Sequence, residues 1–316
     1  MTRRAGAGFA LRLGFSGLLL ALVLARTDLG AAALRIASAD LALLAAAFAA
    51  TALQILAISW RWSAIMDGIG APLGLGRALA VNLGSLFVGQ ALPTSVGSDA
   101  WRVWRVRLLG HPVSAGVHGV LVDRAAALGG LVVVVGATLP ALYPRVADPD
   151  WRTALTAGLA VAAALLVLAV SADRIARVLP PWRWLEAAGR FTEALRGLAR
   201  RPRHALPLVA VSVLVHLGAG ATAWLIARSL DLPASLADCI VLMPPVLLLA
   251  GLPISLAGWG VREGAMVALF GAAGLPADGV LPLSLIFGLL LLAASLPGAA
   301  VVLLGTDLRR VPEDPR

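Results

Sequence analysis

Long runs of apolar residues, separated by short polar stretches, dominate the chain. The clearest runs cover residues 41–58, 125–142, 154–170, 205–226 and 280–305. Each approaches or exceeds the roughly 18 apolar residues that a helix needs to cross a bilayer. A further run near the N-terminus, ending at Ala25, has the form of a signal peptide, but the many later runs favour a first span that stays attached. The pattern therefore predicts an all-α, polytopic membrane protein with about six spans.

Two shorter apolar segments are interrupted by proline at matching places in the two halves of the chain. The segment 92–96 (Leu-Pro-Thr-Ser-Val) recurs 160 residues later as 252–256 (Leu-Pro-Ile-Ser-Leu). Pro93 and Pro253 each remove a backbone donor and disfavour helix at the preceding residue. Backbone groups freed in this way persist at membrane depth only inside protein or beside a wet cavity. We therefore expect a structural break at both prolines.

The match extends beyond the prolines and divides the membrane domain, residues 1–316, into two repeats. Arg102 aligns with Arg262, and the flanking apolar runs fall roughly in step. The repeats are expected at about 8–142 and 153–305, and each has spans on both sides of its broken segment.

The distribution of arginine indicates whether the broken segments cross the membrane. If all eight apolar segments crossed, 11 arginines would face the cytoplasm and 14 would face outward. If the broken segments instead enter and leave on one side, the split becomes 19 to six, which fits the cytoplasmic excess of basic residues. Ordinary proline-kinked spans are the alternative. The re-entrant arrangement gives each half three crossings, opposite orientations and cytoplasmic termini, as in transporters that bind substrate where broken helices meet.

Charged residues at membrane depth are the main candidates for a site, because they are costly there unless paired or functional. In the first repeat, Asp99 and Arg102 share a helix face if the helix restarts near Ser98, after the break at Gly97. Asp123 and Arg124 lie within an apolar run. Asp123 is free to pair with Arg102 or with the arginine of the second repeat. Alternatively, these charges simply reach the headgroup level.

In the second repeat, Gly258 and Gly260 flank Trp259, and this arrangement favours an irregular backbone. Arg262 lies on the side expected to be poor in basic residues, which favours a functional role. Glu263 is its neighbour. Two serines, Ser95 and Ser255, follow the two prolines. With Trp259 and the charged residues of both repeats, they make up the predicted substrate-binding set.

Composition supports a membrane-embedded protein and excludes several classes of function. Sixty per cent of residues are hydrophobic, 14% are charged and the mean hydropathy is +0.90. The net charge of +9 fits contact with anionic lipid rather than nucleic acid. A basic amphipathic helix is expected at about 172–204 on the cytosolic leaflet. The single cysteine and the absence of phosphate-binding, metal-binding and hydrolase motifs predict no cofactor and no metal site.

Several of these segments together resemble the lysylphosphatidylglycerol synthase transmembrane family, also called flippase-like. They are Trp60-Arg61-Trp62 with Gly70, the segment 92–102, Asp123-Arg124 and the segment 252–264. The family commonly has Gly-Gly-Asp where this chain has Gly97-Ser98-Asp99. The resemblance implies a module linked to lipid translocation. In the best-known member, that module precedes an aminoacyl-transferase domain. This chain stops at Arg316 without one, so we expect it not to make that lipid.

The sequence thus predicts a lipid translocator of the cell membrane that moves an amphipathic, anionic or lipid-linked substrate between leaflets. The substrate headgroup would contact Arg102 and Arg262. Asp99 and Glu263 would orient the two guanidinium groups or exchange protons to couple transport. The expected partners are membrane lipids, with lipid-biosynthesis enzymes as a further option. A membrane-embedded transferase, or an accessory subunit in lipid or polyprenol-linked glycan metabolism, is the second hypothesis. A non-transporting scaffold is the third.

Overall fold

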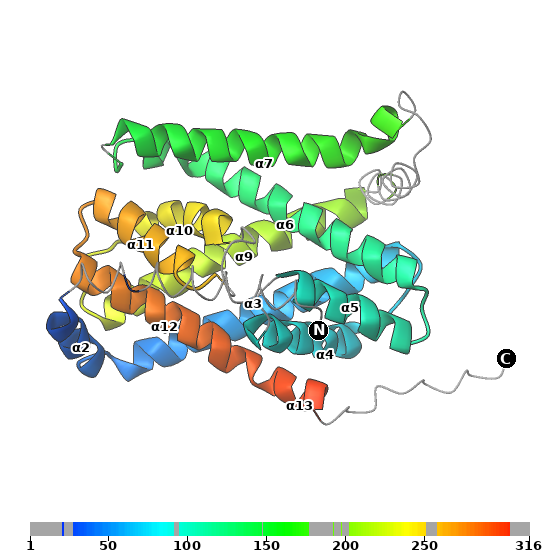
Figure 1. Ribbon diagram of the computed structural model, residues 1–316, viewed down its shortest axis with the longest axis horizontal. Coiled ribbons are helices and arrows are strands. Elements are labelled where there is room, and N and C mark those ends of the chain that lie inside the picture. The colour runs from blue at the N-terminus through cyan, green and yellow to red at the C-terminus, as the bar shows by residue number, and fades with distance from the viewer. Residues whose placement is uncertain are drawn as a thin grey trace, which may run out of the picture.

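The computed structural model describes residues 28–91, 95–146, 148–176, 202–250 and 258–303, with the single positions 21, 192 and 197 (Figure 1). Every regular element in these ranges is an α-helix. Among the described residues, five helices are long and apolar enough to cross a membrane: α3 (Leu41–Gly68), α6 (Val113–Leu142), α7 (Pro149–Ala176), α9 (Pro202–Ser229) and α12 (Ala277–Ser295). They coincide with the five apolar runs, so the prediction of an all-α polytopic membrane protein is confirmed. Apart from the single position 21, the N-terminal run lies outside the described residues.

Each broken segment forms two short helices that pack against each other. In the first half these are α4 (Leu75–Ala91) and α5 (Ser95–Leu108), and in the second α10 (Leu236–Ala250) and α11 (Val261–Ala272). At 1.5 Å per residue, each is only about 18–26 Å long. None reaches the roughly 30 Å of a hydrocarbon core by itself. In each half, one helix ends before the proline segment and another begins after it. Pro93, Pro253 and Ser255 themselves lie outside the described residues.

The detailed position of the first break differs from the prediction. Helix α5 already begins at Ser95, whereas we expected a restart near Ser98. Gly97 therefore lies in the first turn of α5 and is not itself the break. The second break agrees better, because Gly258 and Gly260 have positive φ angles of 82° and 83° just before α11. Only glycine adopts this conformation at little cost.

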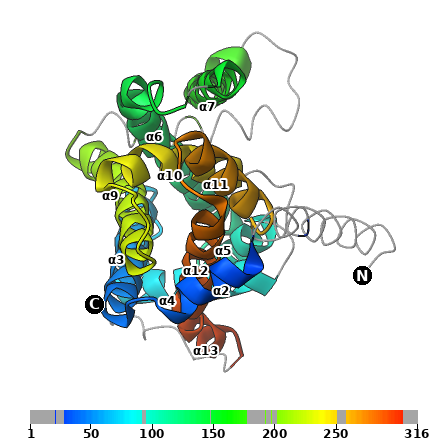
Figure 2. The same cartoon turned by 90° about the vertical axis from the view of Figure 1, so that its left-hand side faces the viewer.

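The order of elements repeats along the chain. The first half has the order α3, α4–α5 pair, α6. The second half has the order α9, α10–α11 pair, α12, and α7 lies between the two series. The first members of the two series, α3 and α9, pack along each other. Helix α7 lies at one edge of the bundle and α13 (Pro297–Leu303) at the opposite edge (Figures 1 and 2). The repeat boundaries and the opposite orientation of the halves stay predictions.

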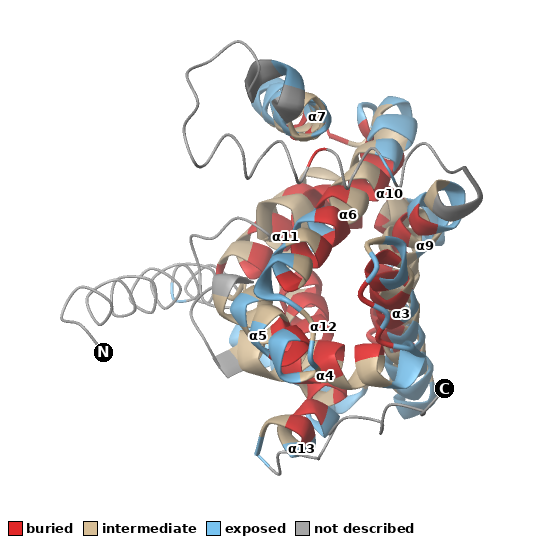
Figure 3. Ribbon diagram, turned by 90° about the vertical axis from the view of Figure 1, so that its right-hand side faces the viewer, coloured by how far each residue is buried: buried red, intermediate tan, exposed pale blue. Residues whose placement is uncertain are grey.

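Buried residues lie on the inward faces of the helices, whereas α7 is mostly exposed or intermediate (Figure 3). Small residues allow close helix contact: Gly130 of α6 lies against Ser212 of α9, and Gly220 of α9 lies against Ile240 of α10. Such contacts are typical of helices packed in membranes. Helix α2 (Leu29–Ala37) joins the second half through an ion pair between Arg35 and Asp278 at 3.2 Å. Most of the predicted basic amphipathic helix at 172–204 lies outside the described residues.

Candidate functional site

A buried carboxylate that is shared by two arginines forms the centre of the first charged cluster. Asp123, in the first half of α6, accepts a hydrogen bond from Arg61 Nε of α3 at its Oδ1 and from Arg102 Nη1 of α5 at its Oδ2, both at 2.8 Å. The three residues are 4%, 4% and 9% exposed. Since charges at this depth are costly without partners, one carboxylate ties three helices together.

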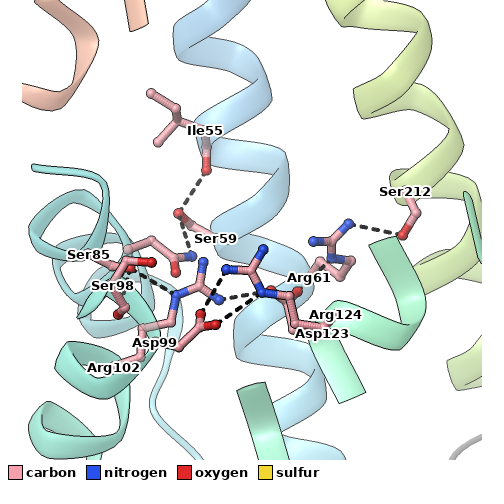
Figure 4. Close-up of polar contacts among 11 residues, drawn as sticks. Ile55, Ser59, Arg61, Ser85, Ser98, Asp99, Arg102, Asp123, Arg124 and Ser212 are labelled. Carbon is pink, nitrogen blue, oxygen red and sulfur yellow. Dashed lines mark hydrogen bonds and ion pairs between the residues drawn. The ribbon is translucent and has the colours of Figure 1, made fainter. Parts of the chain in front are cut away.

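Neutral groups extend this cluster on both sides (Figure 4). Arg61 Nη1 donates to Ser212 Oγ of α9 at 3.0 Å, so the network reaches the second half of the chain. Arg102 Nε donates to Ser85 Oγ of α4 at 3.2 Å. The Arg102 guanidinium also lies 5.0 Å from the centre of the Trp62 ring, within cation–π range. The Arg102 side chain is therefore held from three sides.

Asp99 pairs with Arg124 and not with Arg102. Arg124 donates through Nε and Nη2 to the two oxygens of Asp99, at 3.2 and 3.0 Å. This bidentate pair joins α5 to α6 beside the buried cluster, but it is more open, with the Arg124 side chain 52% exposed. The carboxylate beside Arg102 is Asp123, one of the pairings that the sequence left open.

The second charged cluster lies at the start of α11. Arg262 donates to Glu263 Oε1 through Nη2 at 2.6 Å and Nε at 3.1 Å, as expected for a carboxylate that orients this guanidinium. Glu263 Oε2 accepts the Gly260 N–H at 2.6 Å, and its Oε1 also accepts from Ser284 of α12 at 3.3 Å. The Arg262 guanidinium lies 4.6 Å from the centre of the Trp259 ring. This cluster is charge-neutral, because its one cation and its one carboxylate pair with each other.

The two clusters do not share a hydrogen bond or an ion pair within the described part of the chain. The partners of Arg102 belong to α4 and α6, and those of Arg262 belong to α11. The side chain of Ser95 lies outside what the structure describes. The direct meeting of the two arginines at one headgroup therefore stays a proposal.

The charge count placed Arg61 among the cytoplasmic arginines, and the structure shows that its side chain is buried in the first cluster. It is 4% exposed and bonded to Asp123. Removing the buried arginines of the described residues from both sides of the predicted count, Arg61, Arg102 and Arg105 from one and Arg262 from the other, leaves sixteen against five, so its direction is unchanged. The signal for Arg61 was its position at the end of an apolar run, between two tryptophans. Ser85 and Ser212 carry no such signal, because single serines are common in membrane helices.

The structure offers no metal site within the residues it describes, since no three His, Cys, Asp or Glu side chains come together there. A cavity of about 560 Å³ opens at the junction of α6 and α7, lined by Tyr143, Arg152 and Thr156 among others. It contains none of the predicted site residues. The candidate site is thus the pair of charged clusters rather than this hollow.

The comparisons with known proteins agree with the membrane architecture. The model of the family described as lysylphosphatidylglycerol synthase TM region matches residues 9–298. No curated protein matches the chain. The family match covers nearly the whole sequence, and the chain therefore belongs to this family. The resemblance noted from the sequence motifs is confirmed.

Proposed function

We propose that this member of the lysylphosphatidylglycerol synthase TM region family moves an amphipathic lipid between the leaflets of the cell membrane. The substrate has an anionic or lipid-linked headgroup, which is attracted by the arginine excess of the first cluster and contacts Arg102 and Arg262. Its tails stay in the surrounding lipid. The N- and C-termini face the cytoplasm in this proposal.

One observation carries the proposal: buried arginines lie at both interrupted helix pairs of an apolar bundle. Arg102 belongs to α5 and Arg262 to α11, and the sequence places them at equivalent positions of the two repeats. Ionisable groups inside a membrane bundle are typical of substrate pathways. Interrupted helices in matching positions are typical of transporter binding sites. Ser95, Ser255 and Trp259 are the further residues proposed to line the path.

The arrangement of carboxylates favours translocation over a transferase reaction. A transferase needs a carboxylate that can act as a general base and reach its substrate. Asp123 is occupied by two guanidinium groups, and Glu263 by Arg262, Ser284 and the Gly260 N–H. Asp99 is engaged in a bidentate pair with Arg124. These contacts suit groups that hold arginines in place.

The test is flipping by the purified protein in liposomes that contain a fluorescent phosphatidylglycerol. Replacing Arg262 with Ala is expected to abolish flipping while the protein still expresses and inserts. Because that change leaves the buried Glu263 carboxylate without its cation, the double variant Arg262→Gln/Glu263→Gln is measured beside it. Arg228→Ala is the matched control, since Arg228 is exposed and also lies over a tryptophan, 5.9 Å from the ring centre of Trp224.

Equal flipping by wild type and by the folded Arg262 variants would refute the proposed role of Arg262. Mass spectrometry of the lipid after the assay separates the two hypotheses, because a translocator changes the position of a lipid and leaves its mass unchanged. A new lipid product made by the purified protein would favour the transferase.

A further inference from the structure

Arg105 is a buried cation that has no counter-ion among the residues that the structure describes. It lies in the last turn of α5 and is 8% exposed. Its Nε atom is buried and has no hydrogen-bond partner, and none of the ion pairs of the described residues includes it. Buried guanidinium groups normally have a carboxylate or several acceptors. Arg61, Arg102 and Arg262 all follow this rule in the same protein.

Two tryptophans cover the Arg105 guanidinium. Its Cζ atom lies 5.5 Å from the ring centre of Trp101 and 5.9 Å from that of Trp104. The two rings are tilted by 51°, and Trp104 is 49% exposed. Ring faces attract a cation but accept no hydrogen bond from Nε in this structure. The tryptophans therefore leave the donor and most of the charge uncompensated.

Arg105 lies beside the beginning of α6, one of the candidate membrane spans. Val103, two residues earlier, contacts Gly116, which lies in the first turn of the α6 span. The Arg105 carbonyl accepts the N–H of Leu109 in the loop between α5 and α6. Arg105 is thus about level with the beginning of the span, where lipid phosphates and interfacial tryptophans are found.

The surrounding charges add to the imbalance. The buried charged residues of α3, α5 and α6 are three arginines, Arg61, Arg102 and Arg105, and one carboxylate, Asp123. Asp123 already accepts from the first two. The C-terminal end of α5 favours a cation but supplies only a fraction of a negative charge. Among the described residues no carboxylate pairs with Arg105, which leaves its charge available to an external anion.

We propose that Arg105 binds the phosphate group of an anionic membrane lipid, or the same group as free phosphate, at the end of α5. A guanidinium presents paired donors that match phosphate oxygens. Trp104, the exposed ring, forms the side of the site that faces the lipid. This goes beyond the proposed translocation, since binding at Arg105 requires no movement of lipid between leaflets.

Binding of phosphatidylglycerol to the detergent-purified protein tests the proposal, with native mass spectrometry as the measurement. Arg105→Met replaces the cation with an apolar chain of similar length, and Arg105→Gln is the second variant. Each is expected to weaken the apparent affinity about tenfold or more, since a charge-assisted contact is lost. Arg107→Met is the matched control, because Arg107 is exposed on the same helix and its loss removes the same charge. It is expected to change binding little.

A second arm titrates inorganic phosphate without added lipid. Arg105-dependent binding of lipid alone identifies a lipid headgroup as the ligand, whereas Arg105-dependent binding of free phosphate as well identifies a general phosphate site. If neither ligand distinguishes the Arg105 variants from Arg107→Met, the proposal is wrong. Failure of both Arg105 variants to fold in lipid-free detergent would also overturn it, because the partner of Arg105 would then lie inside the protein. The flipping assay is independent of all these outcomes.

Discussion

The shared carboxylate of Asp123 is the residue on which the first cluster depends. It accepts one hydrogen bond from Arg61 and one from Arg102, each at 2.8 Å, and all three residues are more than nine-tenths buried. A buried ion pair contributes little net stability compared with apolar packing, but removing one partner leaves an uncompensated charge. Loss of Asp123 would leave two buried arginines without their carboxylate at once. The loss of stability should therefore greatly exceed that from breaking a surface ion pair.

We therefore expect Asp123→Asn to destabilise the protein by about 3–5 kcal/mol, the usual cost of breaking a buried pair. Asp99→Asn is the matched control, because it removes a carboxylate from the neighbouring pair with Arg124, whose side chain is 52% exposed. Exposed pairs contribute only about 0–1 kcal/mol. Denaturant unfolding in detergent measures both variants. Equal losses for the two aspartates would show that Asp123 does not hold the arginines in place.

At the scale of single helices, most of the fold could be predicted from the sequence. Apolar runs of sufficient length predict membrane spans because every backbone group must be bonded within its own helix in lipid. The five described spans follow this rule. The prolines also predicted the helix pairs. The exact start of α5 at Ser95 could not be predicted, since proline disfavours helix only at the residue before it and leaves the restart to tertiary contacts.

The candidate site was harder to predict than the helices. Arg102, Asp123, Arg262 and Glu263 could be identified because charged residues in apolar segments are conspicuous. Their pairing could not, because it depends on how α3, α5 and α6 approach one another. Arg61 and Arg105 were counted as topology signals, and only burial distinguishes them from exposed arginines such as Arg107.

Contact between α11 and α12 depends on a glycine that leaves room for Arg262. A Cβ atom at Gly288 would overlap the Arg262 guanidinium. Gly288→Ala should therefore destabilise the protein by about 1–3 kcal/mol, as overpacking usually does. Gly264→Ala is the control in α11, because nothing lies within 4 Å of its Cβ position and alanine favours helix by up to about 1 kcal/mol. Thermal unfolding in detergent should show shifts of opposite sign, and a neutral Gly288→Ala would show that Arg262 is free to move.

For the whole molecule, the two charged clusters occupy matching helix pairs but differ in charge. The first charged cluster, around Asp123, has an excess of arginine, whereas the second is a neutral pair of Arg262 and Glu263. If the halves are inverted, these ends belong to opposite leaflets. A substrate anion would then be attracted more strongly from the side of α5, which gives the proposed translocator a preferred side of entry.

The inverted arrangement can be tested by labelling single cysteines with a membrane-impermeant maleimide, in a background where Cys239, the only native cysteine, is replaced by Ala. Asp67 and Arg107 are exposed positions at the ends of α3 and α5. Both should react only from the cytoplasmic side, because the α4–α5 pair enters and leaves there. Leu236 and Pro276 flank the α10–α11 pair and should react only from outside.

Asp150, exposed at the start of α7, should react only from outside in the same experiment. Labelling of Asp67 and Arg107 from opposite sides would mean that the first helix pair crosses the bilayer as a kinked span, and α6 would then run in the other direction. The two halves would no longer be inverted, and Arg105 would lie in the outer leaflet. The same labelling pattern therefore decides which leaflet supplies the phosphate that Arg105 is proposed to bind.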